Sequence, residues 1–216
     1  MAVVIDELLQ EPVLPLILQR LQAILAQEQE RRQYFYDVVT EEQKAEFING
    51  EIVVHSPVKL KHNRASSLLH RLLSAYVDEH DLGFVGYEKL LVTLTRNDYE
   101  PDVCFFDQAK AQHFLPDQMK FPAPDLAVEV LSASTADHDR GIKFRDYALH
   151  GVTEYWMIDP TAEMVEQYVL QGEKYELRIK SNSGDLQSVT VAGFTIPIRA
   201  IFDEKVNLAT LRQLVQ

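Results

Sequence analysis

The spacing of apolar residues predicts helices in several parts of this 216-residue chain. Apolar side chains recur every three to four positions over residues 12–36, which predicts an amphipathic helix that packs on the domain or on a second subunit. The same spacing predicts a helix over residues 59–80. Its predicted buried face consists of Leu60, Ser67, Leu68, Leu72, Leu73, Tyr76 and Val77. A further helix is expected over about residues 136–150, ended by Gly151, and a short one after Asn207.

Shorter apolar runs between these helices predict strands. The pair Asn49-Gly50 favours a two-residue turn in which both residues have a positive φ, so residues 45–57 predict a β-hairpin. The run DLAVEVL at 125–131 is almost continuously apolar, as in a central strand that is buried on both faces. Other strands are predicted at 84–94, 102–107, 154–159, 164–171, 175–179, 188–191 and 194–202.

The order of these elements predicts the fold class. We expect an α/β (α+β) domain over residues 40–216, with a mixed central β-sheet flanked by helices. Residues 1–39 form an N-terminal helical extension in this interpretation. No repeat or internal linker interrupts the chain.

Composition and charge restrict the class of protein. No apolar run reaches the roughly 20 residues that cross a bilayer, and the N-terminal segment lacks the basic region of a signal peptide, so we expect a cytoplasmic protein with no membrane partner. A single cysteine, Cys104, excludes an internal disulfide and a cysteine-rich zinc site. The formal net charge of −12 argues against a protein that coats nucleic acid nonspecifically. It is compatible with an acidic metal pocket beside a local basic strip.

Carboxylates within or beside the predicted strands are the strongest chemical signal. Glu129 lies inside the apolar run at 125–131, where a carboxylate is costly unless it is paired or holds a metal. A buried salt bridge, or a strand end that reaches solvent, would also explain it. Asp102 begins another predicted strand, and Glu46 begins the hairpin. Asp102 and Glu129 on neighbouring strands would form an oxygen-rich site that suits Mg²⁺ or Mn²⁺.

Two basic side chains are candidates to act beside these carboxylates. Lys143 shares a helix face with Asp139 and Tyr147, and it either forms a solvent-exposed pair with Asp139 or extends back toward the carboxylates. In the second case its ammonium would position the attacking water and offset phosphate charge. His62, on the early turns of the helix at 59–80, is either a polar contact or a peripheral member of the site.

One ordered set of short motifs extends over roughly residues 40 to 205. It consists of E-F-I-N-G-E-I-V at 46–53, Pro57, His62, E-P-D-V at 100–103, P-D-L-A-V-E-V-L-S at 124–132, Asp139, Lys143, Tyr147, G-V at 151–152, E-Y-W at 154–156 and D-P at 159–160. In this order the motifs resemble the Uma family of predicted restriction endonucleases, within the PD-(D/E)XK nuclease superfamily. The resemblance implies a restriction-endonuclease-like core with a divalent-metal site for phosphodiester hydrolysis.

The resemblance also assigns residues to the superfamily's motif. Asp102 corresponds to its first acidic residue and Glu129 to its second. Leu131 stands where the motif lysine is usual, and the lysine that replaces it is Lys143 on the following helix. Glu46 matches the glutamate of the family's hairpin and is the candidate to complete the acidic cluster.

These observations lead to one main hypothesis about function. We expect a Mg²⁺- or Mn²⁺-dependent endonuclease that hydrolyses DNA phosphodiester bonds, with Asp102, Glu129 and the backbone carbonyl of Val130 as metal ligands. Lys143 would act on the attacking water, and Glu46 would be an outer or second-metal ligand.

Two other interpretations of the same sequence stay open. One is a catalytically silent nuclease-fold protein that acts in binding or assembly, which the acidic charge and the apolar N-terminal helix favour. The other is a hydrolase that acts on RNA or on another phosphate ester. A homodimer formed through the N-terminal helix is expected under all three interpretations.

Overall fold

The computed structural model describes residues 2–40 and 43–216. Its helices are α1 (Ala2–Leu9), α2 (Leu14–Val38), α3 (Leu60–Glu79), α4 (Gln108–Ala111), α5 (Ala136–His138), α6 (Phe144–Leu149) and α7 (Glu204–Leu214), with a π-helical turn at Asp139–Lys143 and a 3-10 turn at Ile198–Ile201. Its strands are β1 (Ala45–Ile48), β2 (Glu51–Val54), β3 (Gly83–Tyr87), β4 (Leu91–Thr93), β5 (Asp98–Tyr99), β6 (Val103–Asp107), β7 (Lys120–Phe121), β8 (Leu126–Val130), β9 (Glu154–Asp159), β10 (Met164–Gln171), β11 (Lys174–Ser181), β12 (Asp185–Gln187) and β13 (Thr195–Pro197).

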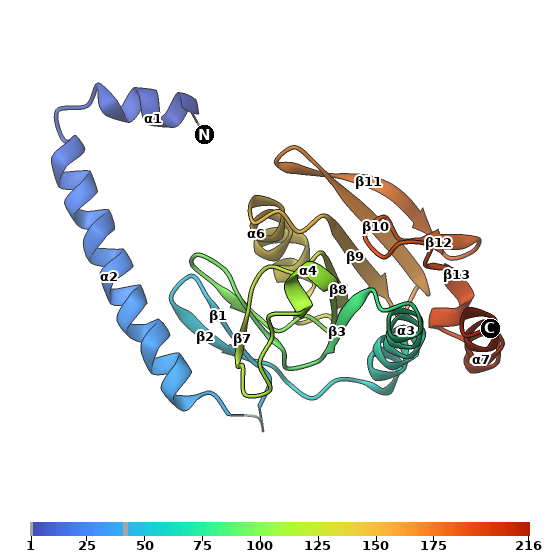
Figure 1. Ribbon diagram of the computed structural model, residues 1–216. Coiled ribbons are helices and arrows are strands. Elements are labelled where there is room, and N and C mark those ends of the chain that lie inside the picture. The colour runs from blue at the N-terminus through green and yellow to red at the C-terminus, as the bar shows by residue number, and fades with distance from the viewer. Residues whose placement is uncertain (1, 41–42) are drawn as a thin grey trace.

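A six-stranded mixed sheet forms the centre of the molecule, in the order β11-β10-β9-β8-β6-β3 (Figure 1). Strands β8 and β9 run parallel, and the other neighbouring pairs of this sheet are antiparallel. The predicted hairpin forms as β1 and β2, with Asn49 and Gly50 both at positive φ. It belongs to a separate five-stranded sheet, in the order β2-β1-β5-β4-β7, rather than to the central one.

The central strands are buried on both faces, as the continuous apolar run at 125–131 predicts. Successive side chains of a strand point to opposite faces, so Leu126, Val128 and Val130 join the core under α3. Ala127 packs in the second core, on the side of α6. Glu129 shares that face with Ala127, and the strand period therefore directs its carboxylate toward the helix that follows β8.

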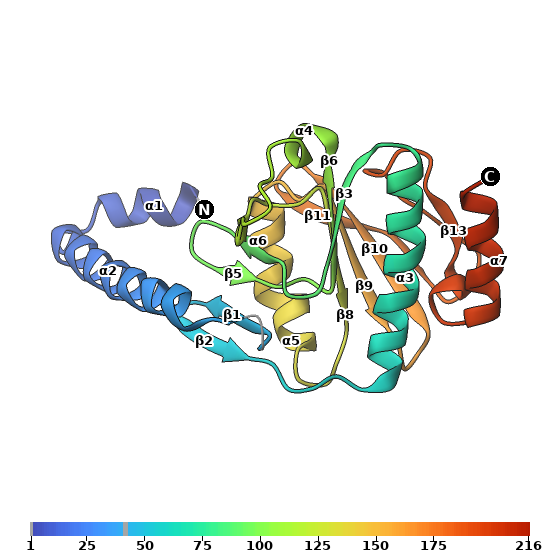
Figure 2. The ribbon, with the colours of Figure 1, turned by 60° about the horizontal axis from the view of Figure 1, so that its bottom comes forward.

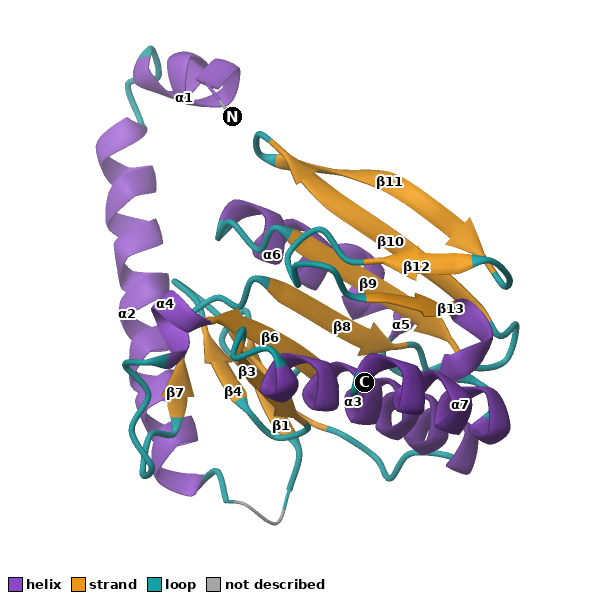
Figure 3. Ribbon diagram, turned by 45° about the vertical axis from the view of Figure 1, so that its right-hand side comes forward, coloured by secondary structure: helices purple, strands orange, loops and turns teal. Residues whose placement is uncertain are grey.

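Helix α3 covers one face of the central sheet beside α7 (Figure 3). Its buried apolar residues are Ala65, Leu68, Leu69, Leu72, Leu73 and Val77. The sequence-based assignment of Leu60 and Ser67 to this face is wrong: Leu60 is exposed in the first turn, and Ser66 is buried in place of Ser67. The helical period brings His62 onto the buried face as well, one turn before Ser66.

The helix predicted over residues 136–150 forms in three parts. These are α5, the π-helical turn at Asp139–Lys143, and α6, which ends before Gly151 at a positive φ of 74°. A π-helical turn inserts one extra residue per turn, and such turns are frequent at functional sites. Here both ends of the turn, Asp139 and Lys143, are buried. The predicted C-terminal helix starts earlier than expected, at Glu204, because Asp203 accepts hydrogen bonds from the first free N–H groups.

The predicted N-terminal helix forms as α2, and only its C-terminal part packs on the domain. Phe35 is fully buried there, and Arg32 donates to both carboxylate oxygens of Asp98 at 2.6 and 2.9 Å. The first half of α2 and the unpredicted helix α1 extend beyond the sheets (Figures 1 and 2). Five large apolar side chains in that half are exposed: Leu16, Leu18, Leu21, Ile24 and Leu25. No helix within the described ranges is long and apolar enough to span a membrane.

Candidate active site

The two carboxylates predicted to form the site come from adjacent strands. Asp102 immediately precedes β6, which pairs with β8 through Val103 and Val128, and Glu129 lies one residue farther along β8. The backbone N–H of Val130 donates a 2.7 Å hydrogen bond to Oδ2 of Asp102. Both carboxylates are almost completely buried. The backbone of the central sheet therefore sets the relative position of the two acids.

Lys143 extends from the π-helical turn into the centre of the acidic cluster. Its Nζ lies 2.8 Å from Oε1 of Glu46, 3.0 Å from Oε1 of Glu129 and 3.3 Å from Oδ1 of Asp139. The Lys143 side chain is 2% exposed, so the alternative of a solvent-exposed pair with Asp139 is wrong. Tyr147, one turn later, donates a 3.2 Å hydrogen bond to Glu129 Oε1. The face shared by Asp139, Lys143 and Tyr147 thus faces Glu129.

Glu46 reaches the cluster from β1, in the five-stranded sheet. Its Oε1 also accepts from the backbone N–H of Glu100 at 2.9 Å, and its Oε2 lies 2.9 Å from Nε2 of His55. Burial alone would raise the pKa of Glu46, but the charge of Lys143 and the contact with His55 outweigh it and lower the pKa to about 2. Glu46 is therefore an ionised carboxylate whose two oxygens are both used inside the protein.

Two basic side chains contact Asp102. Lys44 Nζ lies 2.7 Å from Oδ1, and His62 Nε2 lies 3.3 Å from Oδ2. Burial would raise the pKa of Asp102, but Lys44 and His62 hold it well below its usual range. His62 thus contacts one of the two candidate metal ligands, and its peripheral role at the site stays a prediction. Lys44 is a site residue that sequence reasoning missed, because it lies in a polar segment before the hairpin where no periodic pattern distinguishes one lysine from another.

Glu129 has the opposite electrostatic environment. Burial raises its pKa, and the nearby carboxylates of Asp139 and Asp102 add to this effect, so that the pKa stands well above its usual value despite Lys143. The site holds four buried carboxylates, on Glu46, Asp102, Glu129 and Asp139, against the ammonium groups of Lys44 and Lys143. This excess of negative charge favours binding of a proton or another cation at Glu129.

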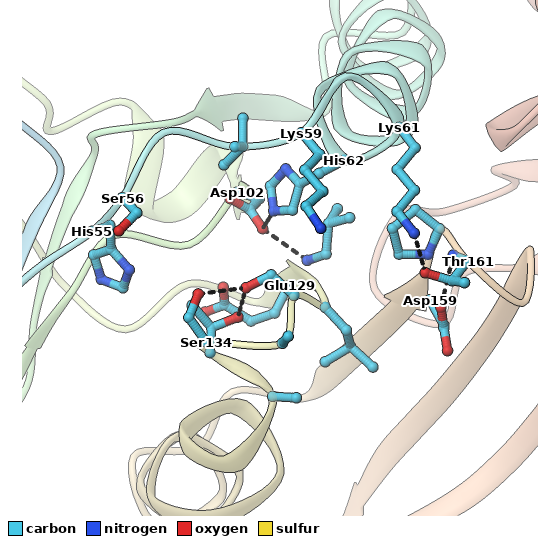
Figure 4. Close-up of a pocket in the computed structure, with 18 of the residues that line it drawn as sticks. His55, Ser56, Lys59, Lys61, His62, Asp102, Glu129, Ser134, Asp159 and Thr161 are labelled. Carbon is cyan, nitrogen blue, oxygen red and sulfur yellow. Dashed lines mark hydrogen bonds and ion pairs between the residues drawn. The ribbon is translucent and has the colours of Figure 1, made fainter.

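A cavity of about 610 Å³ opens beside these groups (Figure 4). Asp102, Glu129 and Val130 line its floor at the carboxyl end of β8, where ligands of sheets with parallel strands commonly bind. The rest of the wall combines apolar side chains, such as Val58 and Leu131, with polar and basic ones. Among them are Lys44, Lys59, Lys61, Ser132, Ser134, Thr135 and Arg140. Lys59 and Lys61 extend from the start of α3 (Figure 4). The cavity thus combines an acidic floor with basic groups at its wall.

The chemistry of these donors fits a hydrated Mg²⁺ or Mn²⁺ ion. Carboxylate and carbonyl oxygens are the ligands that these cations prefer, and Mg²⁺ keeps several of its waters when bound to protein. Asp102, Glu129 and Val130 supply such oxygens at the floor of the cavity. Within residues 2–40 and 43–216, no group of three or more His, Cys, Asp or Glu side chains is arranged to hold a metal ion. The fit is therefore to an ion held by two carboxylates together with backbone and water.

Comparisons with known proteins agree with this fold. A chain in a crystal structure titled "putative nuclease belonging to DUF820", from Anabaena variabilis, superposes with a TM-score of 0.67 at 19% identity, over 82% of this chain and 96% of that one. This likeness confirms the predicted α/β class with its mixed sheet flanked by helices.

Two proteins of Synechocystis sp. are similar in sequence. Uncharacterized protein sll1609 is 33% identical over 61% of this chain and 75% of its own length. Uncharacterized protein slr1290 is 26% identical over 74% of this chain and 84% of its own length.

A family model gives the assignment itself. The model named Uma2, with the description "Putative restriction endonuclease", matches residues 27–199. The match starts in the second half of α2 and includes all the candidate site residues, from Lys44 to Lys143. The resemblance inferred from the ordered motifs is thereby confirmed, and the chain belongs to the Uma2 family.

Proposed function

We propose that this protein is a metal-dependent endonuclease that hydrolyses DNA phosphodiester bonds in the cavity beside β8. The observation that supports this most directly is the pair of buried carboxylates, Asp102 and Glu129, which line one open cavity. Burying two acids side by side is costly unless a cation compensates them. A family described as restriction endonucleases gives the same direction.

The proposed metal ligands are Asp102, Glu129 and the backbone carbonyl of Val130. A divalent ion held there would polarise the phosphoryl oxygen and lower the pKa of a bound water molecule. The hydrogen bond from the N–H of Val130 and the contact with His62 hold the carboxylate of Asp102 in one orientation. A cation at Glu129 would offset the effect of the neighbouring carboxylates, which together with burial raise the pKa of this group.

Lys143 and Glu46 support the site from inside the protein in this proposal. Lys143 borders the cavity, but its side chain is almost completely buried and its Nζ donates to Oε1 of Glu129, so we propose that Lys143 positions Glu129. Glu46 does not line the cavity, whereas Asp102 and Glu129 do. We therefore propose Glu46 as the counter-charge of Lys143 and not as a ligand of a second metal.

DNA is the proposed substrate because the wall of the cavity has a basic side. Lys59, Lys61 and Arg140 lie around the acidic floor, where they can contact the phosphates that flank the cleaved bond. The net charge of −12 limits nonspecific attraction, so binding depends on this local strip. RNA and small phosphodiesters present the same phosphate group and are the substrates to compare with DNA.

Calorimetry and cleavage assays test the proposal together. Mg²⁺ and Mn²⁺ are titrated into the wild type, Asp102→Ala and Glu129→Ala, and each protein is assayed on duplex DNA, single-stranded DNA, RNA and a chromogenic phosphodiester. We expect binding and cleavage of DNA that both variants lose. Full metal-dependent cleavage by Glu129→Ala would contradict the assignment, and cleavage of RNA alone would change the substrate.

The N-terminal helices favour a second role, in assembly. Between Glu11 and Glu28 the only charged residue is Arg20, and the apolar side chains Leu14, Leu18, Leu21 and Leu25 continue the stripe that farther along α2 packs on the domain through Phe35. A neutral, leucine-rich face fits a copy of itself better than a charged partner. We propose a homodimer through α1 and the first half of α2, with residues 40–216 as the nuclease domain and residues 1–39 as its extension. A dimer that binds no metal would favour the catalytically silent alternative.

A further inference from the structure

The two lysines of the acidic cluster differ in how their ammonium groups are used. Lys143 Nζ lies within 3.3 Å of three carboxylates and donates a hydrogen bond to Oε1 of Glu129, and its side chain is 2% exposed. Lys44 has one partner in the described structure, Oδ1 of Asp102 at 2.7 Å, and its side chain is 20% exposed. An ammonium has three donors, so Lys44 keeps two that the protein does not use.

The place of Lys44 directs those two donors to the cavity. Lys44 lines the cavity together with Asp102 and Glu129, just before β1. The ion pair with Asp102 holds the ammonium of Lys44 at the acidic floor of the cavity. A phosphate oxygen bound in the cavity beside Oδ1 of Asp102 would therefore lie near Nζ of Lys44.

We propose that Lys44 is a catalytic residue that donates hydrogen bonds to a non-bridging oxygen of the cleaved phosphodiester. This inference rests on the proposed nuclease function and adds the side chain that contacts the reacting phosphate. Negative charge on the phosphoryl oxygens is stabilised most strongly by a donor already held in place, and the bond to Asp102 holds Lys44 in this way. Lys143 is then the positioning residue, which orients Glu129. In this proposal Lys44 and Lys143 together perform the roles of the single lysine in the superfamily's motif.

The other basic groups of the cavity have different places. Lys61 donates to Oγ1 of Thr161 at the start of the turn that follows β9. Arg140 forms a two-bond ion pair with Glu166. Both are therefore held by partners other than Asp102 and Glu129, and they suit flanking phosphates rather than the reacting one.

The test compares variants with the same loss of charge. Lys44→Met, Lys44→Arg and Lys143→Met are compared with Lys174→Met, a control on the exposed strand β11 outside the cavity. Each is measured for thermal midpoint, for cleavage of duplex DNA with Mg²⁺, and for binding of a fluorescein-labelled duplex by anisotropy with Ca²⁺ in place of Mg²⁺. We expect Lys44→Met to reduce kcat by about 100-fold or more, as removal of one preorganised donor does. We expect Lys44→Arg to recover part of the lost activity. We also expect the thermal midpoint of Lys44→Met to fall by less than half as much as that of Lys143→Met.

Three results would overturn the inference. They are cleavage by Lys44→Met within threefold of the wild type, no recovery by Lys44→Arg, or a loss of thermal midpoint in Lys44→Met as large as in Lys143→Met. If the wild type cleaves no nucleic acid, the proposed function fails. The anisotropy measurement by itself then tests whether Lys44 contacts a DNA phosphate. Weaker DNA binding by Lys44→Met, by tenfold relative to Lys174→Met, then supports a phosphate contact, whereas equal binding excludes it.

Discussion

The backbone N–H of Val130 donates a 2.7 Å hydrogen bond to Oδ2 of Asp102. Strand β8, which contains Glu129, therefore also orients the carboxylate of Asp102, the other candidate metal ligand. We predict that Asp102→Asn keeps a folded protein, because an amide oxygen at this position still accepts from Val130, but that it loses Mg²⁺ binding with the charge. Titration calorimetry beside circular dichroism measures both. If Asp102→Asn binds Mg²⁺ with the affinity and enthalpy of the wild type, Asp102 is not a metal ligand.

Removal of the buried ammonium should strongly destabilise the fold. Lys143→Met leaves the carboxylates of Glu46, Glu129 and Asp139 without their shared cation, and the loss of one partner of a buried ion pair costs about 3–5 kcal/mol. Urea denaturation measures the loss. The double variant Lys143→Met with Glu46→Gln should recover part of it, because one of the uncompensated charges is gone. If the single variant loses no more than Lys174→Met, Lys143 has no structural role.

The stability should also depend on pH through Glu100. Burial raises the pKa of Glu100 from its ordinary 4.5 to about 7. Between these values the unfolded carboxyl has lost its proton while the folded one retains it, so the folded state binds more protons and the free energy of unfolding falls as pH rises. Glu100→Gln lacks this pH-dependent loss. Its free energy of unfolding should therefore rise relative to that of the wild type by up to about 3 kcal/mol between pH 5 and pH 8.

Thermal denaturation across this pH range compares Glu100→Gln with the wild type. Glu176→Gln, on the exposed side of β11, is the matched control. Parallel pH profiles for Glu100→Gln and the control would show that Glu100 ionises in the folded protein as it does in the unfolded chain.

The proposed dimer predicts the effect of charges on α2. Leu21 and Leu25 are about half exposed, so glutamate at both positions should leave the chain folded and convert a dimer to a monomer. Light scattering coupled to gel filtration gives the mass. Leu149 and Leu177 are equally exposed elsewhere, and their double substitution by glutamate should leave the dimer intact. A wild type with the mass of one chain would contradict the dimer.

Much of the fold could be predicted because local patterns determine it. The Asn49-Gly50 turn, the apolar run of β8 and the stop at Gly151 each depend on a few adjacent residues, and each forms as predicted. The separation of the hairpin into its own sheet depends on long-range pairing, such as that of Phe47 with Asp98, which periodicity does not contain.

The candidate site was predictable where a residue conflicts with its surroundings. Glu129 is conspicuous because a carboxylate interrupts an apolar strand. Asp102 at a strand start and Lys143 on a helix face with Asp139 are weaker signals, which the family motifs strengthen. Lys44 is not conspicuous, since a lysine in a polar segment is consistent with an exposed loop. Its place beside Asp102 results from tertiary packing, as does the position of Lys143 Nζ between Glu46 and Glu129.

The acidic cluster joins two sheets that could otherwise shift against each other. Glu46 belongs to the five-stranded sheet and Glu129 to the central one, with Lys143 between them. The five-stranded sheet also holds α2, through Arg32 and Asp98, and Asp98 pairs with Phe47, next to Glu46. A rotation of one sheet relative to the other would therefore change the separation of Glu46 and Glu129. A force applied to the distant end of α2 would reach Glu46 through the Arg32–Asp98 ion pair and the pairing of Asp98 with Phe47.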